Sequence, residues 1–93
     1  DSVSENLKGL RQLESGFADL NLEWIPSVAN FISVRVGASA TQIFDSMLRQ
    51  GVIVRPVANY GLTEHLRISV GLEQENNRAL QALKTALLET EST

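Results

Sequence analysis

The 93-residue sequence has no cysteine, a single histidine and no apolar stretch long enough to cross a bilayer. The lack of cysteine excludes disulfide bonds and thiolate metal sites, and His65 alone does not supply the ligands of a zinc site. A membrane-spanning helix needs about 20 consecutive apolar residues. We therefore expect no metal and no membrane partner. Because no basic segment followed by an apolar one opens the sequence, we also expect a cytoplasmic protein.

Positive charge in excess is also lacking, since the net charge is −3 and the pI is about 5.0. Nucleic-acid partners need a basic face that neutralises phosphates, so we expect no nucleic-acid partner. The composition is that of an ordinary globular protein, with 43% hydrophobic residues, and the length suits one small domain. We therefore predict that residues 1–93 form a single domain.

Apolar periodicity predicts three helices, over residues 3–20, 40–50 and 73–89. Ser39 offers a cap for the second helix, and Gly51 follows it where a left-handed residue ends a helix at low cost. The apolar residues that recur at helical spacing are Val3, Leu7, Leu10, Leu13 and Phe17 in the first helix, and Ile43, Phe44, Met47 and Leu48 in the second. In the third helix, Leu80, Leu83 and Leu87 are predicted to form a buried line.

Alternating apolar residues predict strands over 31–36, 52–55 and 65–70, and residues 21–27 hold a short edge strand. Pro56 is expected to stop the second of these strands, with a loop over 57–64. A right-handed crossover then places strand 65–70 between the other two, antiparallel to both. The predicted fold class is α+β: a small, mostly antiparallel sheet of three strands plus a short edge strand, with helices packed on one face.

Arg55 and Arg67 are the residues that most suggest a site. Each interrupts a short apolar strand, in the runs Gly51-Val52-Ile53-Val54-Arg55-Pro56 and Leu66-Arg67-Ile68-Ser69-Val70-Gly71. A guanidinium grips a carboxylate or phosphate with two parallel hydrogen bonds, so two of them predict a site for a small dianion. Alternation directs Leu66, Ile68 and Val70 to the helices, and therefore Arg67 and Ser69 to the other face. Phe31 and Ile53 are also candidates for that face.

Simpler interpretations remain open for each residue. Arg67 suits a solvated sheet face, and Arg55 and Arg35 suit ordinary strand-end charges. His65 is expected at a loop edge, with no serine or cysteine nucleophile motif near it, so we name no catalytic residue.

Four segments stand out along the sequence: Asn30-Phe31-Ile32-Ser33-Val34-Arg35, Gly51-Val52-Ile53-Val54-Arg55-Pro56, Leu66-Arg67-Ile68-Ser69-Val70-Gly71 and Glu75-Asn76. In this order and spacing they resemble the C-terminal small domain of histidinol-phosphate aminotransferases. The resemblance covers about residues 10–87, and single segments are shared with other class I and II aminotransferases.

The resemblance implies a part of a fold type I enzyme that uses pyridoxal phosphate. Such enzymes transfer an amino group between glutamate and imidazole-acetol phosphate in histidine biosynthesis, or in the reverse direction between histidinol phosphate and 2-oxoglutarate. It implies that Arg67 holds the substrate carboxylate and that Arg55 helps to hold the phosphate or the distal carboxylate. It also implies a homodimeric full-length enzyme whose large domain is the partner of this one.

The resemblance also has limits. The family's cofactor-binding lysine and aspartate belong to the large domain, which this sequence lacks, and Lys8 and Lys84 are its only lysines. We therefore expect the isolated chain to bind no cofactor and to be inactive. Two alternatives stay open: an aromatic amino acid aminotransferase or another fold type I relative, and a stand-alone anion-binding regulatory module.

Overall fold

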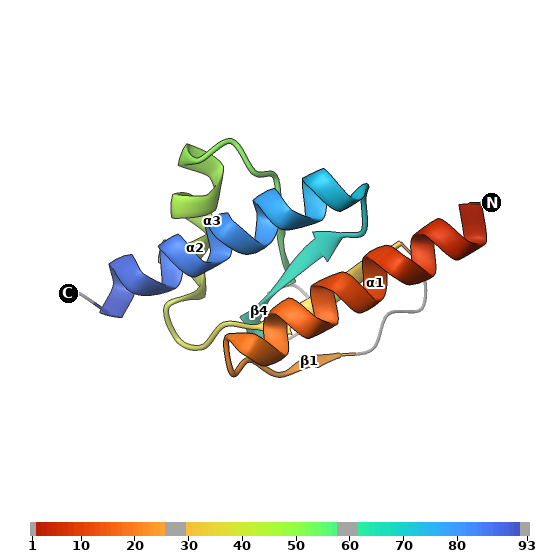
Figure 1. Cartoon of the computed structure of the whole chain (residues 1–93). Helices are drawn as coiled ribbons and strands as arrows, with labels where there is room; N and C mark the ends of the chain where they lie inside the picture. The colour runs from red at the N-terminus through yellow and green to blue at the C-terminus, as the bar shows by residue number, and fades with distance from the viewer. Residues whose placement is uncertain (1, 26–29, 58–61, 92–93) are drawn as a thin grey trace.

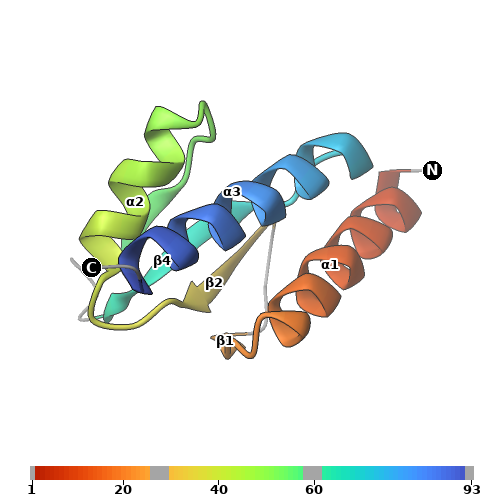
Figure 2. The same cartoon turned by 60° about the vertical axis from the view of Figure 1, so that its left-hand side comes forward.

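Three helices cover one face of a four-stranded sheet in the computed structural model, which describes residues 2–25, 30–57 and 62–91 (Figure 1). The α+β class is therefore confirmed. Figure 2 shows α3 between α1 and α2, with the strands behind this helical layer. The elements in chain order are α1 (Ser2–Asp19), β1 (Trp24–Ile25), β2 (Phe31–Arg35), α2 (Ala40–Arg49), β3 (Arg55–Val57), β4 (Leu62–Ser69) and α3 (Glu73–Glu91).

The sheet has the strand order β1-β2-β4-β3, and all neighbouring strands are antiparallel. The predicted insertion of the last strand between the two earlier ones is confirmed. So is the short edge strand, since Trp24 and Ile25 pair with Val34 and Ser33 of β2. The strand that carries Arg67 therefore occupies an interior position, with β2 on one side and β3 on the other.

The predicted bounds of two strands were wrong. β3 comprises Arg55–Val57 instead of residues 52–55, and Pro56 lies inside it. An edge strand tolerates proline because one of its sides needs no backbone donor, and β3 pairs only with β4. β4 begins at Leu62, inside the segment predicted as a loop, and residues 58–61 lie outside the described residues. Ile53 was expected in the strand over residues 52–55, but it precedes β3 and is 78% exposed, so that expectation was wrong.

The core lies between the sheet and the helices. Alternate residues of the two interior strands are fully buried there, namely Ile32 and Val34 of β2 and Leu66 and Ile68 of β4. Each such side chain contributes roughly 1.5–3 kcal/mol to the free energy of unfolding when it leaves water.

Among the described residues, every helix is too short or too polar to cross a bilayer.

Left-handed residues end the first two helices. Asn21 (φ 61°) follows α1, and Gly51 (φ 83°) follows α2 as predicted. In each case a backbone N–H beyond the turn returns to the helix, from Leu22 to the Phe17 carbonyl and from Val52 to the Met47 carbonyl, both at 2.9 Å. Satisfying these last carbonyls is what stops a helix sharply. Ser39 does flank α2, but the prediction of a side-chain cap was wrong, because its hydroxyl makes no capping hydrogen bond.

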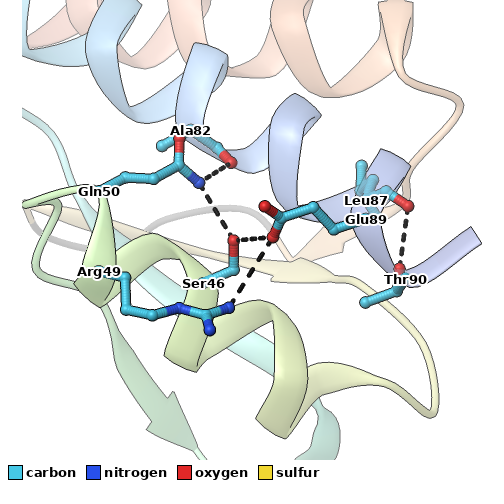
Figure 3. A network of polar contacts seen from close by, with 7 residues as sticks. All are labelled: Ser46, Arg49, Gln50, Ala82, Leu87, Glu89 and Thr90. Carbon is cyan, nitrogen blue, oxygen red and sulfur yellow. Dashed lines mark hydrogen bonds and ion pairs between the residues drawn. The ribbon is translucent and has the colours of Figure 1, made fainter. Parts of the chain in front are cut away.

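Polar side chains join α2 to α3 (Figure 3). The buried Ser46 hydroxyl donates to Glu89 Oε1 at 2.5 Å, and Gln50 Nε2 donates to Ser46 Oγ at 3.2 Å and to the Ala82 carbonyl at 3.1 Å. Arg49 adds an exposed ion pair to the same carboxylate at 3.9 Å. These contacts fix the position of α2 along α3, because a buried hydroxyl without partners would be costly.

Glycines allow α1 to approach α3 and the end of β4 closely. A Cβ atom on Gly9 would lie 2.8 Å from Val70 Cγ1, 2.9 Å from Asn76 Nδ2 and 3.0 Å from the Gly71 carbonyl oxygen. Leu13 and Phe17 are fully buried along the same helix. Leu7 shares their helical spacing but is 51% exposed: the close contact is made through glycine and not through the larger apolar side chain.

Asn76 fastens the turn between β4 and α3. Its side chain is 1% exposed, accepts from the Gly71 N–H at 2.9 Å, donates to the Gly71 carbonyl at 2.9 Å and donates to Gln12 Oε1 on α1 at 3.0 Å. Glu75 Oε1 accepts from the Leu72 N–H at 2.8 Å, which supplies the cap that α3 lacks in sequence. The strand that carries Arg67 is thus tied at its end to both α1 and α3.

We predict that Gly9→Ala destabilises the protein. Alanine is favoured over glycine in a helix by about 1 kcal/mol, but overpacking against backbone and a buried amide costs about 1–3 kcal/mol. The unfolding free energy measured in urea should fall by up to about 2 kcal/mol, which is the overpacking cost less the helix-propensity gain. Ser15→Ala, on an exposed position of the same helix, is the control and should leave it nearly unchanged. A more stable Gly9→Ala protein would contradict the close contact.

Candidate functional site: a pair of facing arginines

Arg55 and Arg67 face each other across two adjacent strands. They are direct register partners in the β3–β4 pair. Leu66 and Ile68, on either side of Arg67, are buried beneath the helices, so alternation directs Arg67 to the opposite face, as predicted. Side chains of register partners lie on the same side of a sheet. Two residues 12 positions apart in sequence therefore project from one patch of the face that the helices leave open.

No carboxylate within the described residues neutralises this pair. The ion pairs there join Arg35 to Glu64 at 2.8 Å and Arg49 to Glu89 at 3.9 Å, and neither includes Arg55 or Arg67. Like charges directly opposite each other destabilise an antiparallel pair. An anionic ligand would relieve this repulsion, and it could accept bidentate hydrogen bonds from the two planar guanidinium groups. The arrangement is therefore suited to an anion.

The surroundings of Arg67 come from β2. Phe31 pairs with Ser69 and Ser33 pairs with Arg67, so both β2 side chains share the open face with the arginines. The guanidinium carbon of Arg67 lies 4.6 Å from the centre of the Phe31 ring. A cation within about 6 Å of an aromatic face is attracted by the ring quadrupole. Sequence alternation placed Phe31 on this face, but it did not predict the contact.

The other candidate residues have simpler roles. Arg35 forms an exposed pair with Glu64, and such surface pairs contribute at most about 1 kcal/mol. His65 was expected at a loop edge but lies within β4 opposite Arg35, where its buried Nδ1 has no hydrogen-bond partner among the described residues. No group of acidic, histidine or cysteine side chains in the described parts of the chain has the arrangement of a metal site.

The arginines lie outside the hollows on the helical side. A hollow of about 560 Å³ between α1 and the start of α3 is lined by Lys8, Gln12, Leu72 and their neighbours. A second, of about 540 Å³, lies beside α3 and includes Ile53 and Arg78. Neither includes Arg55 or Arg67, which are presented instead on an open sheet surface.

Residues 2–83 match the family described as aminotransferase class I and II. The chain belongs to this family. It is 58% identical, over 88% of its length, to histidinol-phosphate aminotransferase 2 of Pseudomonas fluorescens strain Pf-5, and 52% identical, also over 88%, to the protein of that name from Pseudomonas aeruginosa PAO1. The chain spans 22% of the length of each of these two aminotransferases.

A solved structure carries the same fold. The crystal structure of a putative aminotransferase from Burkholderia pseudomallei superposes on 90% of this chain with a TM-score of 0.80 and 27% sequence identity. The match uses 26% of that protein. The similarity therefore concerns one part of that protein.

Enzymes of this aminotransferase family generally use pyridoxal phosphate, which a lysine holds as a Schiff base. Lys8 and Lys84, the two lysines of the sequence, are both exposed on helices. The helices cover the face of the sheet opposite to Arg55 and Arg67. The residues of this chain therefore do not fit the cofactor.

We predict that Arg55→Gln stabilises the protein while removing part of the site. It relieves the repulsion between like charges on register partners, so the unfolding free energy should rise by about 0.5 kcal/mol at low salt. Urea unfolding at roughly 0.01 M and roughly 1 M salt measures this, and the gain should vanish at high salt because screening removes the repulsion. Arg11→Gln, an exposed change of equal charge on α1, controls for net charge. A loss of stability in Arg55→Gln at low salt would show that Arg55 has a partner.

Proposed function

We propose that this chain is the C-terminal small domain of a pyridoxal-phosphate-dependent aminotransferase, and that it binds the substrate. The full-length enzyme would transfer an amino group between histidinol phosphate and 2-oxoglutarate in histidine biosynthesis. Two findings support this proposal: the similarity to proteins named histidinol-phosphate aminotransferase, and the paired arginines on the open face.

The register pairing of Arg55 with Arg67 on the open face is the observation that carries the proposal. Glutamate has two carboxylates and histidinol phosphate has a phosphate, so one site must bind either kind of anion in turn. Guanidinium forks match both geometries. We assign the substrate carboxylate to Arg67, which the Phe31 ring holds, and the phosphate or distal carboxylate to Arg55 at the edge of the sheet.

The role of these residues is to orient the substrate. Each bidentate contact removes rotational freedom before the reaction, and such positioning supplies a large part of the rate gain of enzymes. The cofactor, its lysine and the residues that complete the pocket belong in this proposal to a large domain. Consistent with that, the relatives named above are more than four times as long as the stretch that this chain matches. We further propose that the full-length enzyme is a cytoplasmic homodimer and that the isolated chain has no transaminase activity.

Removal of either arginine from the full-length enzyme should weaken substrate binding. The loss of a charge-assisted hydrogen-bonding partner costs about 1.5–3 kcal/mol, so steady-state kinetics should show kcat/KM lower by about 10- to 150-fold in Arg67→Ala and Arg55→Ala. Arg49→Ala, on the helical side, is the control and should match the wild type.

The pattern across substrates separates the two roles. Arg67→Ala should impair reaction with glutamate, and Arg55→Ala should impair substrates with a phosphate or second carboxylate more than those without. Equal effects of Arg55→Ala on all substrates would contradict its assigned role, and unchanged kinetics in both variants would contradict the site itself. A wild-type preference for aromatic amino acids over histidinol phosphate would identify the alternative aminotransferase.

A further inference from the structure

The Phe31 ring lies against the guanidinium group of Arg67. The ring is half-buried on β2, and the guanidinium carbon lies 4.6 Å from its centre. The register places Phe31 opposite Ser69, so the contact with Arg67 is a diagonal one across neighbouring strands. Diagonal neighbours on one face lie within reach of aromatic and long side chains. The arginine therefore extends sideways, onto β2.

This sideways direction separates the two guanidinium groups. β4 lies between β2 and β3, so a side chain that leans from β4 onto β2 leans away from Arg55 on β3. The attraction to the ring favours side-chain orientations of Arg67 that lie over β2, and disfavours those that lie over Arg55. It also offsets part of the repulsion between the two cations.

We propose that Phe31 is a positioning residue, whose ring fixes the orientation of the Arg67 fork and thereby the separation of the two anion sites. This inference rests on the proposed role of Arg67 in binding substrate. It adds a consequence for selectivity: the site favours molecules whose two anionic groups lie at one preferred spacing. A leucine in place of Phe31 keeps an apolar side chain but lacks the quadrupole that attracts a cation.

Substitutions in the full-length enzyme separate this role from simple packing. Phe31→Leu removes the aromatic face, and Phe31→Tyr keeps it. Phe44→Leu is the matched control, because Phe44 is also half-buried but packs against the core from α2, on the helical side. Thermal unfolding of all three variants measures the packing loss, which the two leucine variants should share.

The kinetic readouts are the KM for glutamate, kcat, and competitive inhibition by malonate, succinate and glutarate, whose carboxylates lie progressively further apart. Phe31→Leu should raise the glutamate KM about three- to tenfold with kcat within twofold. It should also flatten the dependence of inhibition on dicarboxylate length. Phe31→Tyr should retain the wild-type KM and length dependence, and Phe44→Leu should change neither.

Two failures have different meanings. If Arg67→Ala leaves the glutamate KM and dicarboxylate inhibition unchanged, the proposed function of Arg67 fails. If Arg67→Ala weakens both, but Phe31→Leu behaves like Phe44→Leu or Phe31→Tyr behaves like Phe31→Leu, then the site stands and the positioning role of Phe31 is overturned.

Discussion

The facing of Arg55 and Arg67 is the constraint on which the functional account depends. Antiparallel pairing brings the two cations together on the open side of the sheet, and no acid among the described residues balances them. Hydrophobic burial on the other face of β4, where helices cover Leu66 and Ile68, offsets the free-energy cost of this unfavourable pairing. One face of β4 thus carries buried apolar side chains, and the other carries the arginine for which we propose anion binding.

The position of that strand is fixed from both sides. Its C-terminal end is tied through Asn76 to Gly71 and to α1, and Gly9 lets α1 approach the same turn without a side chain between them. Such buried, fully paired polar contacts allow one arrangement and penalise others. A site for a small ligand needs this rigidity, because small displacements of a binding fork weaken bidentate contacts.

Sequence patterns predicted the elements that local chemistry governs. Alternation gave the direction of Arg67, and glycine gave the end of α2 at Gly51. Features set by tertiary contact were missed. Pro56 lies inside a strand because that strand is at an edge, Leu7 is exposed because α1 packs through glycine, and Phe31 contacts Arg67 across strands. A local sequence pattern does not show which residues become neighbours in the folded chain. The roles of the arginines stay predictions that rest on family resemblance and geometry.

The most direct test is a crystal structure of the full-length enzyme with a bound dicarboxylate. The account predicts that the ligand lies on the open sheet face, with Arg67 and Arg55 each holding a different carboxylate at N–O distances of about 2.7–2.9 Å. A ligand bound elsewhere, or arginines occupied by protein carboxylates while the ligand is bound, would contradict it.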